Sequence, residues 1–143
     1  MTPQDRAERA AKLMWDDDPA SQGLGMSLDS IAPGRSVISM RVREDMANGH
    51  GICHGGFIFT LADSAFAFAC NSYNHRVVAQ HNSITYLAPG KLGERLVATA
   101  TETSRNGRSG IYDVTVTGED GRAVALFRGH SRQISGTHFD ETD

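Results

Sequence analysis

The sequence has little cysteine, no long apolar run and no excess of charge of one sign. Its two cysteines in 143 residues exclude a disulfide scaffold and favour a reducing compartment. No stretch of about 18 apolar residues occurs, so we expect no membrane-spanning helix. The N-terminus is mixed in charge and lacks the apolar run of a signal peptide. The sequence therefore predicts a cytoplasmic protein with no membrane partner.

Basic residues do not outnumber acidic ones. The 14 Lys and Arg residues are scattered among 17 Asp and Glu residues, and the formal net charge is -3. A protein that follows a nucleic-acid backbone needs a basic stripe, which this sequence lacks, so we expect no nucleic-acid partner. The hydrophobic share of 39% is ordinary for a globular protein, and the length fits a single domain.

Apolar spacing predicts two helices. Alanines recur at helical intervals between residues 3 and 15, which predicts a short amphipathic helix within residues 1–20. The only polar side chains of residues 57–69 are Thr60, Asp63 and Ser64. A helix that is apolar nearly all round belongs in the centre of a protein, so we expect this second helix to be buried.

Strand-forming segments surround the apolar helix. An alternating segment, residues 36–43, precedes it, and segments rich in β-branched and aromatic residues follow it at 77–87, 95–104, 110–117 and 122–134. Asn106-Gly107 and Asp120-Gly121 are strong hairpin signals between the last three segments.

These elements predict an α+β fold, with a long central helix wrapped by a curved antiparallel sheet of five to six strands. The sheet and the central helix form a single domain at residues 21–135. The amphipathic helix within residues 1–20 precedes this domain. The polar residues 136–143 are expected to form a flexible C-terminal tail.

Asp63 is the one charged residue inside the apolar helix. An ionised carboxylate is costly to bury without a partner. Asp63 is therefore either satisfied by a backbone or arginine partner at the helix edge, or a general base or nucleophile whose pKa is raised by desolvation. We favour the second interpretation because the helix has almost no other polar group.

His54, Gly55 and Gly56 stand where a glycine-rich loop becomes the helix. The N–H groups of Gly55 and Gly56 belong to the first turn, where helix donors lack partners. Together with the positive end of the helix dipole, they suit a carbonyl oxygen that gains negative charge. The alternative is that the glycines only allow tight packing of helix against sheet, and the pair alone does not decide between the two.

Eight residues of helix, about 12 Å, separate Gly55 from Asp63. One substrate carbonyl cannot touch both within a chain. If both act on one substrate, a partner helix must run antiparallel, so that Asp63 of one subunit meets Gly55 of the other. A second copy would also cover the side of the apolar helix that the sheet leaves open, so we expect a homo-oligomer.

Other polar residues have competing interpretations. Cys53 and His54 are adjacent, so their side chains do not easily point at one ion, and this disfavours a metal site formed with His50. The same adjacency disfavours a nucleophile pair of Cys53 and His54. Asn48 is either a turn residue or, with His54, orients a carbonyl or a water. Four basic residues either hold phosphates or are only solvated surface charges. They are Lys91, Arg105, Arg108 and Arg128.

Several segments together resemble a known family. They are Asn48-Gly49-His50, Cys53-His54-Gly55-Gly56, Leu61-Ala62-Asp63, Ala67-Phe68-Ala69-Cys70-Asn71-Ser72, Tyr86-Leu87-Ala88-Pro89-Gly90, Gly110-Ile111-Tyr112-Asp113 and Val124-Ala125-Leu126-Phe127-Arg128-Gly129. Through them the chain resembles the PaaI-type hotdog-fold acyl-CoA thioesterases of phenylacetate degradation, over most of residues 20–135. His-Gly-Gly followed by Asp at this offset is fairly specific to this branch, since other hotdog thioesterases place Glu on the helix.

The resemblance implies a hotdog dimer whose sheets join edge to edge, paired again into a homotetramer, with active sites between subunits. It implies hydrolysis of an acyl-CoA, with an aryl-acetyl acyl group, without a metal or redox cofactor. Asp63 would be the base or nucleophile, and the Gly55 N–H would polarise the thioester carbonyl. Asn48 and His54 would position the carbonyl or the water.

The strand that faces the catalytic acid carries Ser or Thr in some relatives, whereas alignment places Ala79 there, with Gln80 and Ser83 as candidate substitutes. Arg105 and Arg108 are the candidates for binding the CoA phosphates.

Two other functions stay open at this point. A hotdog hydratase or dehydratase would use His54 and Asp63 as an acid–base pair, and a binding module would hold acyl-CoA without reaction. A buried carboxylate argues against the module, because a binder gains nothing from it.

Overall fold

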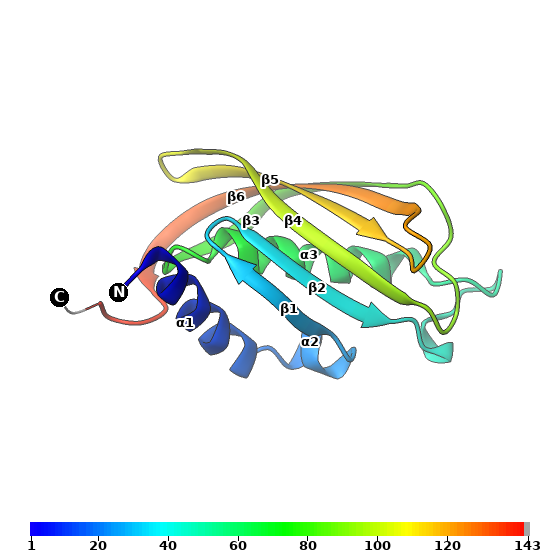
Figure 1. Cartoon of the computed structure of the whole chain (residues 1–143). Coiled ribbons are helices and arrows are strands. Elements are labelled where there is room, and N and C mark those ends of the chain that lie inside the picture. The colour runs from blue at the N-terminus through cyan, green and yellow to red at the C-terminus, as the bar shows by residue number, and fades with distance from the viewer. Residues whose placement is uncertain (142–143) are drawn as a thin grey trace.

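The apolar segment forms the helix α3 (Gly55–Cys70), and a curved antiparallel sheet wraps around it (Figure 1). The computed structural model describes residues 1–141. The other elements, in chain order, are α1 (Pro3–Asp16), α2 (Pro19–Gly23), β1 (Ser27–Ala32), β2 (Arg35–Arg41), the 3-10 helix η1 (Glu44–Met46), β3 (His75–Tyr86), β4 (Arg95–Asn106), β5 (Ser109–Thr117) and β6 (Ala123–Thr137). One central helix and a six-stranded sheet confirm the predicted α+β fold class.

The strands follow the order β1-β2-β4-β5-β6-β3, and every neighbouring pair is antiparallel. The two predicted hairpins are confirmed, because Gly107 and Gly121 turn the chain between β4, β5 and β6 with φ of 62° and 84°. β3 does not pair with β4, the next strand in the chain. It lies at the far edge beside β6, so its other edge is unpaired within residues 1–141.

Two elements, α2 and β1, lie in a region where no element was predicted. α2 is five residues long, too short to show a helical period, and depends on the Asp18 side chain, which accepts the Ser21 N–H at 3.0 Å. β1 lies at an edge of the sheet, and a bulge between Leu28 and Ser30 interrupts its register. A bulge breaks the two-residue alternation by which a strand is predicted.

The core fills the space between α3 and the sheet. From α3 it includes Leu61, Phe66 and Phe68, all at most 1% exposed. The Phe66 ring packs directly against the backbone of Gly129 on β6, where a side chain would leave it no room. The helix and the sheet therefore approach each other so closely here that only glycine fits.

Gly129→Ala is expected to lower the free energy of unfolding by about 1–3 kcal/mol. A Cβ at this position would lie 2.7 Å from the Phe66 ring, which is 1% exposed and has no free space to enter. Gly23→Ala is the matched control, since nothing lies within 4 Å of the added Cβ. Urea denaturation of both variants measures the difference, and equal midpoints would contradict the prediction.

Residues 136–141, the described part of the predicted tail, make contacts with the domain. β6 continues into this segment. The Asn74 side chain accepts two of its backbone N–H groups, at 3.0 and 3.1 Å. The ion pair of Arg6 with Glu141, at 2.8 Å, joins it to α1. Residues 142–143 lie outside the described part of the chain.

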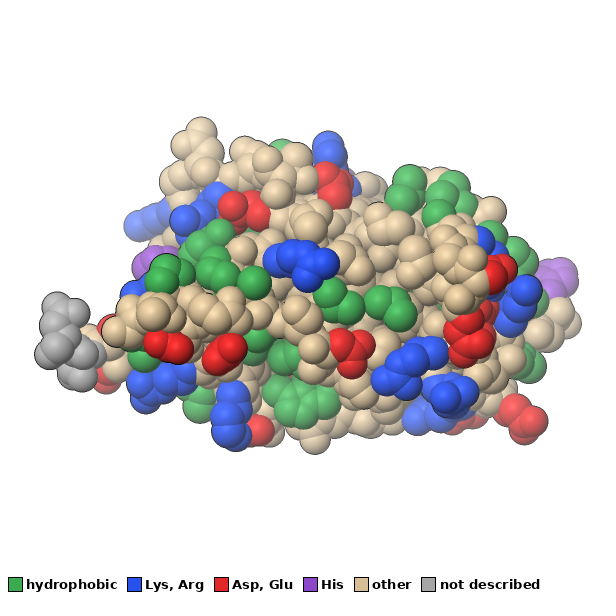
Figure 2. Space-filling view, viewed as in Figure 1, with side chains coloured by type: hydrophobic (Ala, Val, Ile, Leu, Met, Phe, Trp, Pro, Cys, Tyr) green, Lys and Arg blue, Asp and Glu red, His purple; other side chains and the backbone are tan. Residues whose placement is uncertain are grey.

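The surface carries charges of both signs. On the face that Figure 2 shows, Lys and Arg side chains lie intermixed with Asp and Glu side chains. Within residues 1–141, no helix combines the length and the apolarity needed to cross a lipid bilayer.

Candidate active site

His54 caps the start of α3. Its Nδ1 accepts the Gly56 N–H at 2.9 Å, and its ring is exposed and packs edge-on against Phe57 with 6.1 Å between the ring centres. Gly56 permits this cap, because a Cβ there would lie 3.1 Å from the same nitrogen. With Nδ1 as acceptor, the neutral ring carries its proton on Nε2, which is then a hydrogen-bond donor.

Gly55 is packed just as closely, against Tyr86 at the end of β3. The Tyr86 hydroxyl donates to the Gly55 carbonyl at 2.9 Å, and a Cβ on Gly55 would lie 3.0 Å from the ring. Tight packing therefore explains why both glycines lack side chains. The Gly55 N–H, however, has no acceptor among residues 1–141, so the donor predicted for an oxyanion is open.

An open cleft of about 370 Å³ lies beside this helix start. Gly55 and Asn48 are among the residues that line it. Its apolar walls include Ile52, Ile58, Leu87 and Pro89. The free N–H at the positive end of a 16-residue helix therefore adjoins an apolar cleft, where it suits a developing negative charge.

Asp63 lies two turns further along α3 and does not line this cleft. It is partly buried, and Asn82 on β3 donates its Nδ2 to Asp63 Oδ1 at 3.3 Å. Burial raises the pKa of the Asp63 carboxyl above its ordinary value, while the Asn82 hydrogen bond acts to lower it. The desolvated acid predicted from the sequence is present, and its partner is an amide rather than an arginine or a backbone group.

The exposed side of α3 carries Asp63. Gly56, Thr60, Asp63 and Ala67 follow each other at helical spacing, and each is exposed or only partly buried. The residues of α3 that face the sheet are fully buried. Within one chain, the sheet thus leaves a stripe of α3 uncovered.

Asn48 is a turn residue, one of the two interpretations left open by the sequence. Its Oδ1 accepts the N–H groups of His50 and Ile52 at 2.9 and 3.4 Å. Its Nδ2 makes no hydrogen bond within the described residues, so the side chain keeps a donor beside the cleft that Asn48 lines.

Asn82, which the sequence did not suggest, is the residue that hydrogen-bonds to Asp63. The predicted position was Ala79, with Gln80 or Ser83 as substitutes, and none of these hydrogen-bonds to Asp63. A bulge between Ala79 and His81 shifts the register of β3 against β6 close to this contact. Tyr86 was also missed, because an aromatic residue at a strand end gives no signal of its contact with Gly55.

Cys53 does not form a reactive pair with His54. Burial raises the pKa of the Cys53 thiol to about 11, which keeps it protonated, and its sulfur faces the His54 carbonyl at 3.6 Å. His50, Cys53 and His54 do not converge, and no group of three such side chains in residues 1–141 is arranged to hold a metal ion.

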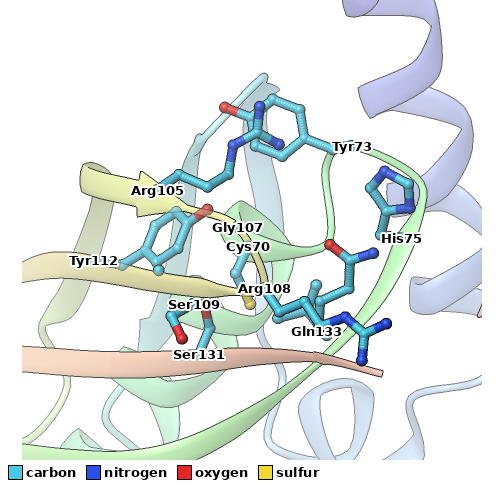
Figure 3. Close-up of a pocket in the computed structure, with 12 residues that line it drawn as sticks. Cys70, Tyr73, His75, Arg105, Gly107, Arg108, Ser109, Tyr112, Ser131 and Gln133 are labelled. Atoms are coloured by element: carbon cyan, nitrogen blue, oxygen red, sulfur yellow. The ribbon is translucent and has the colours of Figure 1, made fainter. Parts of the chain in front are cut away.

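Arg105 and Arg108 lie at the other end of α3, around a small pocket of about 20 Å³ that Cys70 also lines (Figure 3). The Arg105 guanidinium stacks on the Tyr73 ring at 3.5 Å and lies 3.7 Å from Glu102. Within one chain, the helix length of about 24 Å separates these basic groups from Gly55.

The other two basic candidates differ from each other. Arg128 is bound to Asp113 at 2.7 Å, which supports a structural role. Lys91 makes no ion pair within residues 1–141.

Comparisons with known proteins indicate a thioesterase. A family model described as "Thioesterase superfamily" matches residues 50–125. The chain is 41% identical over 132 residues to the acyl-coenzyme A thioesterase PaaI of Escherichia coli, which covers 92% of this chain and 94% of that protein.

Solved structures agree with the sequence comparison. The E. coli PaaI protein from the phenylacetic acid degradation operon matches with a TM-score of 0.93 and 40% identity, over 95% of this chain and 99% of that one. A Streptococcus mutans protein solved with bound acetyl CoA matches with a TM-score of 0.74 and 28% identity, over 78% of this chain and 90% of that one.

Proposed function

The chain belongs to the thioesterase superfamily, has its hotdog fold and is an acyl-CoA thioesterase, and we propose that it hydrolyses aryl-acyl-CoA substrates of the phenylacetyl-CoA type. The observation that carries the proposed mechanism is the open Gly55 N–H at the start of α3, beside an apolar cleft. Gly55 is the oxyanion donor, and Asp63 is the base or the nucleophile.

The active site lies between two copies of the chain. β3 presents 12 residues of unpaired edge, a feature that proteins normally cover, and α3 has an uncovered stripe that includes Asp63. Joining two β3 edges in antiparallel fashion brings two α3 helices alongside each other in opposite directions. Asp63 of one subunit then reaches the cleft beside Gly55 of the other, and two such dimers form a tetramer.

Hydrolysis begins when an oxygen nucleophile attacks the thioester carbonyl carbon. The nucleophile is Asp63 itself or a water from which Asp63 removes a proton. The carbonyl oxygen becomes negative and is stabilised by the Gly55 N–H and the helix dipole. The C–S bond then breaks, and the CoA sulfur leaves and takes up a proton. Where Asp63 is the nucleophile, the acyl group remains on it as a mixed anhydride, and a water then hydrolyses this anhydride to the free acid and restores the carboxylate.

His54 and Asn48 add donors around the same carbonyl. The His54 Nε2 proton and the free Asn48 Nδ2 hydrogens are not used within residues 1–141. They hold the carbonyl or the water in place while their other atoms, His54 Nδ1 and Asn48 Oδ1, are fixed to the backbone. Rigid attachment of both side chains favours precise positioning.

The CoA phosphates bind at Arg105 and Arg108 of the partner subunit. In an antiparallel pair with Asp63 beside Gly55 of the other chain, the far end of α3 extends about 10 Å beyond that contact. The basic groups at this end then face the part of the substrate that leaves the cleft. Because Glu102 lies 3.7 Å from Arg105, Arg108 carries the larger share of the attraction.

Thiol release measured with phenylacetyl-CoA, hydroxyphenylacetyl-CoA and a straight-chain acyl-CoA tests the function. We expect kcat/KM to be about tenfold higher for the aryl substrates, because the cleft has apolar walls with the Tyr86 ring at one side. Faster release from the straight-chain substrate would contradict the aryl preference. Hydration of an unsaturated acyl-CoA without thiol release would indicate a hydratase, and binding without either reaction would indicate a binding module.

A further inference from the structure

Tyr86, the last residue of β3, exposes much of its aromatic side chain within one chain. It is 49% exposed, and it lines the cleft beside Gly55. Leaving so much of an aromatic ring in water gives up the stability that its burial would add. The ring is therefore available to a ligand that enters the cleft next to the open Gly55 N–H.

The Tyr86 ring is held in place from several sides. Its hydroxyl donates to the Gly55 carbonyl at 2.9 Å. Its backbone pairs with Ala125 on β6, and the next N–H, that of Leu87, donates to the Val124 carbonyl at 2.8 Å. Burial raises the pKa of the Tyr86 hydroxyl, so at neutral pH it keeps the proton with which it donates. A ligand that packs against this ring therefore does not have to immobilise it first.

The cleft suits the acyl group of a thioester rather than its CoA part. No charged side chain of residues 1–141 lines it, so the phosphates of CoA would have no counterion there. A thioester whose carbonyl oxygen accepts from the Gly55 N–H places the first carbons of its acyl group beside Gly55. The Tyr86 ring is close to the same point, since a Cβ on Gly55 would lie 3.0 Å from it.

We propose that Tyr86 is a specificity-determining residue, whose ring packs against the aryl group of the substrate. This inference rests on the proposed function, because it requires the thioester carbonyl to bind at the Gly55 N–H. Two aromatic rings attract each other beyond the area that they bury, because the positive edge of one meets the negative face of the other. A saturated ring of similar size fills the cleft but lacks this attraction. Tyr86 therefore selects an aromatic acyl group, and not only an apolar one.

Phenylacetyl-CoA and cyclohexylacetyl-CoA separate the aromatic contact from the size of the acyl group. For the wild type, we expect kcat/KM to be about 3- to 10-fold higher for phenylacetyl-CoA than for cyclohexylacetyl-CoA. Tyr86→Leu should lower this ratio to about one, because leucine keeps an apolar wall without a ring. Tyr86→Met also lacks the ring, has the same expected ratio and serves if leucine disturbs folding. Thiol release measures both substrates.

Tyr86→Phe is the matched control, since it keeps the ring and removes only the hydroxyl. Loss of the hydrogen bond to the Gly55 carbonyl should lower kcat/KM for both substrates alike, by about 2- to 5-fold. The ratio between the two substrates should stay within about twofold of the wild-type ratio. A folding defect also acts on both substrates alike, so the ratio separates specificity from stability.

Three results would overturn the proposal. They are a ratio near one in the wild type, a ratio that the ringless variants leave unchanged, and a ratio that Tyr86→Phe lowers as far as Tyr86→Leu does. The last of these would assign the selectivity to the hydroxyl rather than to the ring. A wild-type enzyme that releases no thiol from either substrate would instead contradict the proposed function, and the inference with it.

Discussion

Asp63→Asn is expected to lower kcat for aryl-acyl-CoA hydrolysis by about 10²- to 10⁴-fold. The amide keeps the shape of the carboxylate but neither removes a proton from water nor attacks a carbonyl. The fold should persist, because Asp63 is only partly buried and its one side-chain hydrogen bond within residues 1–141, to Asn82, is long at 3.3 Å. Thiol release from phenylacetyl-CoA measures kcat, and calorimetric titration with CoA measures binding.

Asp29→Asn is the matched control, since it makes the same chemical change at an exposed position on β1 and should leave turnover unchanged. Near wild-type turnover by Asp63→Asn would contradict the proposed mechanism. A loss of CoA binding or of the oligomer in this variant would instead place Asp63 in the assembly rather than in the reaction.

Gly55→Pro is expected to lower kcat by about 10²- to 10³-fold, because it removes the oxyanion donor and adds none. Proline is tolerated at the first position of a helix, which Gly55 occupies. His54 before it has ψ of 134°, the extended conformation that a following proline requires. The helix should therefore still form, and thiol release with far-UV circular dichroism separates loss of catalysis from loss of fold.

Gly55→Ala is the control for this change. Its Cβ meets the Tyr86 ring at 3.0 Å, as a proline Cβ would, but its N–H remains. The ratio of the two turnover rates therefore measures the donor apart from the crowding. Equal rates in the two variants would show that the N–H does not stabilise the oxyanion.

Mixing the two inactive variants tests whether the site is shared. In a heterodimer of Asp63→Asn with Gly55→Pro, one of the two shared sites combines an intact Gly55 from one chain with an intact Asp63 from the other. Such heterodimers, isolated with two affinity tags, should recover about half of the wild-type rate, since effects at separate sites are independent. No recovery would indicate that each chain holds a complete site.

Local patterns in the sequence were sufficient to predict the central helix and the two hairpins. The helix α3 was predictable because an apolar run with so few polar residues suits only a buried helix of this length. The two hairpins followed from their turn residues, because an Asn-Gly or Asp-Gly pair supplies the positive φ that a tight turn needs. Asp63 and the donors of the first helical turn were identified for the same reason, since helix geometry alone determines their spacing.

The elements that depend on distant contacts were not predictable. α2 and β1 have weak local patterns and are held by contacts with α3 and β2. The place of β3 beside β6 follows from pairing across more than 40 residues, as in the pair of Ser83 with Arg128. The contacts of the segment before residue 142 are with Asn74 and Arg6, which no local pattern connects to it.

The sequence by itself determined the fold class, the family resemblance, the acid on α3 and the open donor at its first turn, because each depends on residues close together in the chain. Only the tertiary structure decided what surrounds them. It placed Tyr86 against Gly55 and Asn82 against Asp63, and it left the β3 edge unpaired. The reason is that β3 reaches α3 only after crossing to the far edge of the sheet, and the bulge at Ala79 and His81 then selects which of its side chains face the helix.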